Sequence, residues 1–336
     1  MARRPSQGSG ESNEQLQSKA LKEFSPMANF TAYLNGKWMP LSEVRIEPSD
    51  RGFFLGDAVF EVVRTFNGKS FRMAEHIDRL YRSMKFTRIE CAITPEEMVR
   101  LSEEAVERNM PNLKEVGDFN IHQTVTRGKG RRSWMAKDPT VLIRIAPLDF
   151  ENFYWSFDTG MHAVITKQQA YHPDALDPKI KHYSRMNFNI AEMEANDLDP
   201  GALPILRDEN GDIAEGSGYN VLIVKDGVIK NADDRSILQG VSRGMVYDLA
   251  KQLNIPVTEE KLQPYDVYTA DEVFFASTTW CVLPISYVDK RKIGAGKPGP
   301  IANQLLAAWS ETVGVDIVGQ AQEYGKRNKE RLSAKK

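Results

Sequence analysis

Alternating apolar and polar positions predict several β-hairpins in this chain. Asn-Gly pairs at 35–36, 67–68 and 210–211 stand inside alternating or apolar runs. Asn-Gly favours a tight hairpin because both residues tolerate the positive φ that a type I′ turn requires. A fourth hairpin is expected over 221–230, where two apolar runs flank Lys-Asp-Gly.

Helices alternate with these hairpins. Apolar residues recur at i, i+3, i+4 and i+7 from Ile77 and again from Val246, as expected for amphipathic helices. Further helices are predicted over 95–109, 185–197 and 300–312, with Met186, Ile190 and Met193 on one face of the second. Antiparallel hairpins mixed with helices favour an α+β fold over a doubly wound parallel sheet.

Changes in composition divide the chain. Residues 1–27 and the charged segment 319–336 have little hydrophobic periodicity, which predicts disordered tails. The stretch 147–158 lacks clear periodicity and lies near the middle, so we place a linker over 151–157. The expected units are therefore 28–150 and 158–318, and we find no internal repeat.

The overall composition is that of an ordinary soluble globular protein. The 336 residues correspond to about two domains, with 41% hydrophobic and 27% charged residues. A net charge of -2 makes nucleic acid a poor first hypothesis. No apolar run reaches the roughly 18 residues of a membrane span, so we expect a cytoplasmic protein. The two cysteines, Cys91 and Cys281, indicate neither a disulfide framework nor a zinc cluster.

Some catalytic motifs are present only in part. Residues 240–244 read Gly-Val-Ser-Arg-Gly, the pattern of a hydrolase nucleophile elbow, but every histidine precedes Ser242 and that fold needs its histidine afterwards. Gly128 and Gly130 lack the third glycine of a dinucleotide fingerprint. The scattered histidines argue against a catalytic metal.

Two hydroxyl-bearing segments are candidate anion sites. Ser242 is expected at the N-cap of a helix, where free N–H groups favour a phosphate. The alternative is an ordinary serine cap with no ligand, which has the same sequence pattern. Ser277, Thr278 and Thr279 follow an apolar strand, and their hydroxyls either donate to the same anion or form a polar loop end.

A lysine and a glutamate are candidates for covalent and electrostatic chemistry. Partial burial of Lys181 would lower its pKa and free its amine for Schiff-base formation, but Lys179 points the same way on a strand and spacing does not choose between them. Glu215 precedes Gly216-Ser217-Gly218, where backbone can approach a ligand closely, or else it is a turn glutamate.

Taken together and in order, these motifs resemble the class IV, fold type IV pyridoxal-phosphate aminotransferases. That family includes branched-chain, D-amino-acid and (R)-amine transaminases and aminodeoxychorismate lyase. The resemblance covers about residues 30–315 and is carried by the run 50–61 (DRGFFLGDAVFE), His76-Ile77-Asp78-Arg79-Leu80, Lys181, the run 215–221 (EGSGYNV), Gly240-Val241-Ser242-Arg243 and Ser277-Thr278-Thr279.

The resemblance implies a role for each matching residue. Lys181 resembles the Schiff-base lysine, and Glu215 the acid that keeps the pyridine nitrogen of pyridoxal 5′-phosphate protonated. Arg79 resembles the phosphate-clamping arginine, joined by the Val241 N–H. The other cofactor-binding residues it implies are Ser217, Gly218, Tyr219, Asn220, Gly240, Ser242, Ser277 and Thr278.

The substrate residues match the family less closely. Phe60, Val62 and Arg64 correspond to the strand that lines the substrate pocket, and Val62 replaces the glycine of branched-chain enzymes. Arg132 falls in register with the carboxylate-binding arginine of D-amino-acid enzymes, but Trp134 stands where their histidine would be; the alternative is a solvated charged loop. We also place His122, Thr279 and Trp280 in the substrate group.

The resemblance implies a small N-terminal α+β domain and a larger C-terminal barrel-like α/β domain, with cofactor between them, in a homodimer. The expected activity is ping-pong transfer of an amino group from an (R)-amine or D-amino acid to a 2-oxo acid, without a metal. Alternatives are a branched-chain L-amino-acid aminotransferase, an aminodeoxychorismate-type lyase, and a binding protein on this scaffold that has lost turnover.

Overall fold

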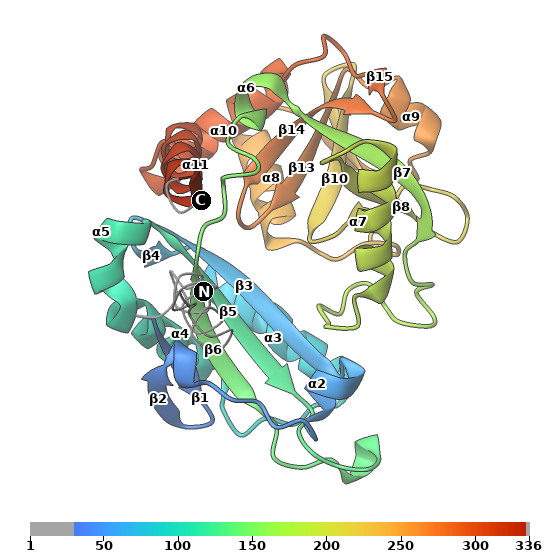
Figure 1. Ribbon diagram of the computed structural model, residues 1–336. Helices are drawn as coiled ribbons and strands as arrows, with labels where there is room; N and C mark the ends of the chain where they lie inside the picture. The colour runs from blue at the N-terminus through green and yellow to red at the C-terminus, as the bar shows by residue number, and fades with distance from the viewer. Residues whose placement is uncertain (1–29, 334–336) are drawn as a thin grey trace, which may run out of the picture.

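Two sheets with packed helices make up the chain in the computed structural model, which describes residues 30–333 (Figure 1). The N-terminal sheet is antiparallel throughout and has the order β2-β1-β6-β5-β3-β4. Its strands are β1 (Thr31–Leu34), β2 (Lys37–Pro40), β3 (Ala58–Phe66), β4 (Lys69–Ser70), β5 (Phe119–Thr126) and β6 (Val141–Pro147).

Helices cover one face of this sheet and leave the other for the site. α3 (Met73–Thr87) and α4 (Pro95–Asn109) bury Leu80 and Leu101 against Val63 and its neighbours on the sheet. Side chains alternate along a strand, so Phe60 and Val62 of β3 lie on the opposite face. Two shorter helices, α2 (Arg51–Leu55) and α5 (Leu113–Val116), lie in the connections.

The C-terminal sheet is mixed and has nine strands. Its main path is β12-β11-β10-β13-β14-β7-β8, with β9 paired to β10 and β15 to β14. The strands are β7 (Met161–Gln169), β8 (Leu203–Arg207), β9 (Glu215–Gly216), β10 (Tyr219–Lys225), β11 (Val228–Asn231), β12 (Val257–Glu259), β13 (Glu272–Ser277), β14 (Cys281–Val288) and β15 (Arg291–Lys292).

Helices of the C-terminal region pack around this second sheet. They are α6 (Ser156–Thr159), α7 (Met186–Leu198), α8 (Val241–Gln252), α9 (Pro264–Tyr268), α10 (Pro300–Val313) and α11 (Ile317–Ser333). α7 contacts β7 and β8, whereas α8 and α10 contact β13. All of these helices except α7 contribute side chains to the larger of two main apolar cores, together with β10, β13 and β14; the other core lies under the N-terminal sheet.

Three of the four predicted hairpins are confirmed. Asn35 (φ 47°) and Asn67 (φ 50°) stand in the left-handed region and join β1 to β2 and β3 to β4, and Asp226 does the same between β10 and β11. The hairpin predicted at Asn210-Gly211 is present only as a tight turn with a single antiparallel bridge, between Arg207 and Ile213. Gly211 has a positive φ of 87° but Asn210 does not, so this is not the expected type I′ turn.

The predicted helices are confirmed, with one correction at a cap. α4 covers the predicted range 95–109, and α7 and α10 agree with theirs to within one residue. The helix predicted from Val246 begins earlier, at Val241. Its N-cap is therefore Gly240, and Ser242 lies in the first turn rather than at the cap.

The C-terminal segment is helical where the sequence predicts a disordered tail. α11 runs to Ser333, and Ile317, Ala321 and Tyr324 recur at i, i+4 and i+7 on its packed side. The high charge of the segment masked this short apolar stripe. The tail predicted over 1–27 lies outside the described residues. No helix in the described part of the chain is long and apolar enough to cross a membrane.

Candidate active site

A cavity lies where the two sheets meet. Its lining comes from α3, β9, β10, the start of α8, the end of β13 and the segment before α7. The lining residues are Arg79, Lys181, Arg185, Glu215, Gly216, Gly218, Tyr219, Asn220, Leu238, Gly240, Val241, Ser242, Ala276, Ser277 and Thr278. Among the cofactor-binding residues predicted from the sequence, Ser217 alone does not line it.

Lys181 is held between the two halves of the molecule. Its carbonyl accepts a hydrogen bond from the Phe60 N–H (3.0 Å) and its own N–H donates to Ser83 Oγ (3.3 Å). Its Nζ lies 4.7 Å from the centre of the Phe60 ring. Burial, and then the Arg79 charge, lowers the pKa of Lys181 to about 8. About a tenth of this amine is therefore unprotonated at pH 7, far more than for an ordinary lysine.

Lys179 does not share this environment. Its Nζ lies 3.2 Å from Asp177 Oδ1 and donates to the carbonyl oxygen of Asp234. The side chain is 40% exposed. The structure thus separates two lysines that residue spacing alone leaves equivalent, and only Lys181, the lysine to which the family resemblance points, lines the cavity.

Arg79 is fixed by a buried acid that sequence reasoning did not single out. Glu61 accepts from Arg79 Nε (2.6 Å) and Nη2 (2.8 Å), while Arg79 Nη1 donates to the Gln239 carbonyl. His76 Nδ1 lies 2.8 Å from the same carboxylate. Burial would raise the pKa of Glu61, but the Arg79 charge and hydrogen bonds hold it well below its usual range. The cation is consequently held rigidly at the cavity wall.

The start of α8 supplies backbone donors beside this cation. The α8 helix begins at Val241, and the first N–H groups of a helix have no partner within it. The absence of a side chain at Gly240 lets the Asn220 side chain pack against the backbone there, because a Cβ at this position would lie 2.2 Å from Asn220 Oδ1. The hydroxyl residues Ser242, Ser277 and Thr278 line the same region. A guanidinium, helix N–H groups and hydroxyls form a set of donors suited to an anion.

Glu215 faces the cavity with little solvent contact. Its Oε2 accepts from the Leu238 N–H (3.1 Å) and from Asn220 Nδ2 (3.4 Å). Burial raises the pKa of Glu215 to about 7, even though the hydrogen bond from the Leu238 N–H and the charge of Arg185 favour its ionised form. This carboxyl group is thus poised to gain from a cation placed next to it.

Tyr219 supports this wall rather than offering its hydroxyl. Its OH donates to the Pro204 carbonyl (2.8 Å), and its ring stacks on Phe275 with centres 4.4 Å apart. Gly216 is packed against that ring, and a Cβ would lie 1.9 Å from it. The small residues around Glu215 therefore let the aromatic ring close the wall behind it.

The predicted substrate residues separate into groups. Phe60 and Val62 share a face of β3, and His122 of β5 is the register partner of Val62. Phe60 also stacks on Tyr183, with ring centres 4.4 Å apart. These side chains form a floor beside Lys181.

Arg64 has a different place from the one predicted. It is 1% exposed and does not line the cavity; its Nη1 donates to the Thr279 carbonyl (2.6 Å). Asn120 Nδ2 donates to Thr279 Oγ1 (3.0 Å), and Trp280 packs against Phe153. Arg64 consequently holds the turn after β13, and Thr279 and Trp280 belong to that turn rather than to the cavity lining.

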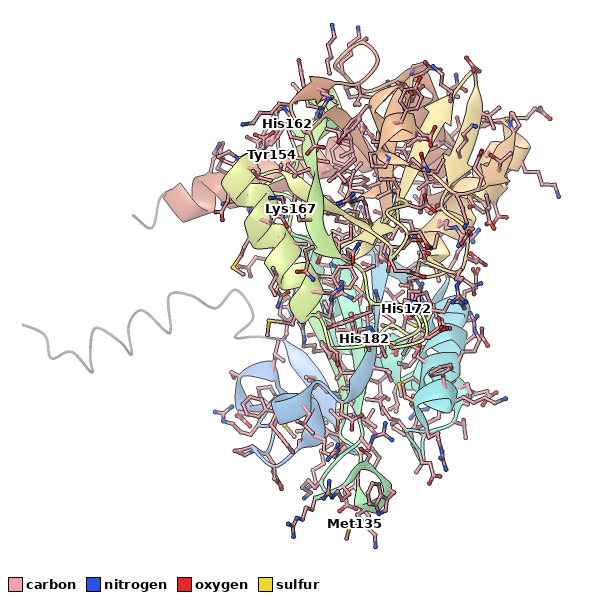
Figure 2. All side chains as sticks on the ribbon, turned by 90° about the vertical axis from the view of Figure 1, so that its right-hand side faces the viewer. Met135, Tyr154, His162, Lys167, His172 and His182 are labelled. Atoms are coloured by element: carbon pink, nitrogen blue, oxygen red, sulfur yellow. The ribbon has the colours of Figure 1, made fainter. Side chains whose placement is uncertain are left out.

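Arg132 and Trp134 lie on an exposed loop away from the cavity of their own chain. Trp134 is 82% exposed and stands 5.9 Å from the Arg132 guanidinium. Figure 2 shows Met135, in the same short helix, at the opposite end of the N-terminal sheet from the C-terminal region, whereas His182 lies near the junction. The two residues do not contribute to this cavity within one chain.

Besides Glu61, which lies behind the cavity wall, sequence reasoning missed Arg185, Leu238 and Ala276 of the lining. Arg185 lies four residues after Lys181, and Leu238 presents its backbone N–H to Glu215. An arginine or leucine in a loop carries no pattern that distinguishes it before the fold is known. Among the described residues, no cluster of His, Cys, Asp or Glu is arranged to hold a metal ion.

Comparisons with known proteins identify the family. Residues 58–288 match the sequence model of amino-transferase class IV. The chain is 35% identical over 280 residues to a Methanocaldococcus jannaschii protein with the provisional name of a branched-chain-amino-acid aminotransferase, covering 81% of this chain and 93% of that one. It is 32% identical over 285 residues to the D-alanine aminotransferase of Listeria monocytogenes, covering 83% and 95%.

Solved structures of similar fold support the same family. The branched-chain amino acid aminotransferase of T.th., solved with pyridoxamine 5′-phosphate, superposes with a TM-score of 0.77 and 27% identity, over 88% of this chain and 96% of that one. The fold type IV architecture expected from the sequence is thereby confirmed. This chain belongs to the class IV aminotransferases, and it is a transaminase-type enzyme.

Proposed function

We propose that the cavity binds pyridoxal 5′-phosphate, with Lys181 as the attachment residue. The donor set fits this cofactor: Arg79, the start of α8 and the hydroxyls of Ser242 and Thr278 suit its phosphate. The Glu215 carboxyl suits the pyridine nitrogen, and the amine of Lys181 suits the aldehyde. The observation that carries the proposal is the convergence of these three chemistries on one cavity.

The residues of this chain divide the chemistry among them. When bound, the cofactor supplies a carbonyl that reacts with amines and a ring that withdraws electrons. Lys181 holds and returns the proton of the substrate carbon, a role that its pKa of about 8 matches near neutral pH. Glu215 supplies the negative charge beside the ring nitrogen. Glu61 keeps Arg79 in place for the phosphate.

We infer that the amino donor is a D-amino acid or an (R)-amine and the acceptor a 2-oxo acid, in a ping-pong cycle. Val62 and Phe60 form the floor beside Lys181, and a valine leaves less room there than the glycine of branched-chain enzymes. The similarity to D-alanine aminotransferases supports this donor. The similarity to branched-chain enzymes makes L-leucine the second candidate.

A half-reaction tests the donor class. Purified protein loaded with pyridoxal 5′-phosphate is mixed singly with each enantiomer of alanine, leucine and 1-phenylethylamine while the visible absorbance is followed. We expect D-alanine or the (R)-amine to bleach the visible band. Bleaching by L-leucine alone would assign the chain to branched-chain substrates, and no bleaching by any donor would contradict transamination.

We further propose that two copies of the chain form a dimer over α7. Met186, Ile190 and Met193 are 66%, 41% and 60% exposed on one face of this helix. Met186 follows Arg185, which lines the cavity, so a second copy seated there lies next to the cavity. A mass of two chains in light scattering supports this arrangement, and a mass of one chain contradicts it.

A further inference from the structure

A strip of side chains that includes a histidine and an arginine crosses the face of the N-terminal sheet that looks toward Lys181. Val62 on β3, His122 on β5 and Arg144 on β6 are successive register partners across three adjacent strands. Their neighbours Val63, Ile121 and Ile145 lie in the core on the opposite face, so alternation places the strip on the side of Phe60 and Lys181. The strip brings a cation into the substrate region.

Arg144 has no acidic partner among the described residues. It makes no ion pair or hydrogen bond there, although it is half-buried on a strand in the middle of the sheet. Burial lowers its pKa, and the group that acts on it electrostatically is the phenol of Tyr183. Burying a guanidinium partly without an acidic partner costs free energy. A bound anion from outside the chain would offset that cost.

His122 stands between this cation and the lysine. Burial, then the charges of Arg144 and Lys181, lowers the pKa of His122 to about 3. The imidazole is therefore neutral at physiological pH and offers a hydrogen bond without adding charge. Tyr183 covers the same region, with its OH 3.0 Å from Thr124 Oγ1 and its ring on Phe60.

We propose that Arg144, with His122 beside it, binds a carboxylate of the amino-acid or oxo-acid substrate; this rests on the proposed transaminase function. Adjacent strands lie about 4.8 Å apart, so the β6 backbone is roughly 10 Å from that of β3, a span that a long arginine side chain and a small acid bridge together. A bidentate guanidinium–carboxylate pair also fixes the orientation of the acid.

Two other arginines, Arg185 of the cavity lining and Arg132, are less suited to this role. Arg185 lies beside Glu215 and Glu192, which favour its charged form, and its guanidinium stacks on Phe188 at 4.1 Å. Its charge therefore already has acids nearby. Arg132 is on the exposed loop described above.

Kinetics of Arg144→Gln in the cofactor-loaded enzyme test the assignment. We expect KM for D-alanine to rise about 10- to 100-fold, the factor for losing a charge-assisted hydrogen bond, while 1-phenylethylamine, which lacks a carboxylate, changes less than about threefold. Arg144→Lys keeps the charge and is expected to recover part of the affinity. If KM rises for glutamate but not for alanine, the site binds the distal carboxylate of the substrate. If KM rises for both amino acids, the site binds the α-carboxylate.

Binding of an unreactive acid gives a second readout that does not need turnover. In calorimetry, 4-methylvaleric acid should bind the wild-type enzyme more tightly than its uncharged amide does, and Arg144→Gln should remove that difference. The proposal would be overturned if Arg144→Gln weakened the binding of carboxylate substrates and of 1-phenylethylamine equally. It would also be overturned if Arg132→Gln, and not Arg144→Gln, selectively weakened the binding of the acid. If no donor bleaches the wild-type enzyme, transamination fails, while the acid-binding arm still decides the role of Arg144.

Discussion

At the residue scale, burial and charge decide which of several similar side chains carries chemistry. The sequence predicts an amine at 179 or 181 and a carboxyl at 215, because these residue types stand beside glycines or apolar runs. Spacing alone does not predict which lysine is enclosed, since that depends on Phe60 and Ser83, both distant in sequence; the family resemblance is what points to Lys181. Glu61 was missed for the same reason: its partners are on a helix that follows in the chain.

The raised pKa of Glu215 leads to a prediction for the cofactor-free protein. Its folded-state pKa of about 7 exceeds the ordinary value of 4.5, so ionisation opposes folding. Stability from this group is fully present below pH 4.5 and is lost as the pH rises through about 7. The loss amounts to about 3–4 kcal/mol at most, because the pKa rises from 4.5 to about 7 and each unit is worth roughly 1.4 kcal/mol. Urea unfolding at several pH values measures it.

The matched variant is Glu215→Gln, which keeps the shape and removes the charge. We expect the cofactor-free variant to gain stability over the wild type at pH 8 and to show no advantage at pH 4.5. With cofactor bound, the wild type should recover most of the difference, because the ring nitrogen supplies a cation beside Glu215. A variant that loses stability equally at both pH values would refute the electrostatic role.

At the element scale, most helices and hairpins could be predicted because each depends on local sequence. α4 and α10 follow from apolar spacing, and the β1–β2 turn from Asn35-Gly36. The parallel pairing of β7 with β8 could not be predicted from local sequence, because α7 and its flanking loops separate the two strands in the chain. Helix α11 was missed because its polar residues outnumber its apolar stripe.

α11 connects the two halves of the molecule behind the site. Gln320 accepts from Arg64 and donates to Asp118 Oδ2 (2.8 Å), and Arg64 in turn holds the Thr279 carbonyl. Tyr324 packs near Phe150 at the start of the linker. One helix thus anchors the arginine that fixes the turn at the cavity rim.

Gln320→Leu tests this connection. The substitution leaves Arg64 without one acceptor in a buried place, so we expect a loss of about 1–3 kcal/mol in the free energy of unfolding, together with a raised KM. Gln322→Leu is the matched control, because Gln322 bonds Asp158 on the exposed side of the same helix. Equal effects of the two variants on KM would show that α11 has no specific link to the site.

At the scale of the whole molecule, the chemistry arises where two separately built sheets meet (Figure 1). The sequence predicted an N-terminal α+β unit and a larger barrel-like α/β unit with a break near 151–157, and the chain passes from β6 to β7 through that stretch. We retain this division as a proposal. The assembly of the cavity from α3, β9, α8 and β13 was not predictable from local pattern, because each contributes only one or two residues. It was the ordered set of motifs that indicated the site.

The most direct test of the account compares Lys181→Ala with Lys179→Ala after addition of pyridoxal 5′-phosphate. The two lysines lie two residues apart, but only Lys181 lines the cavity. We predict that Lys181→Ala loses the visible absorbance band of the attached cofactor and all transamination, while Lys179→Ala keeps both within about twofold, as expected for an exposed pair. A visible band and activity retained in Lys181→Ala, or lost in Lys179→Ala alone, would contradict the assignment of the site.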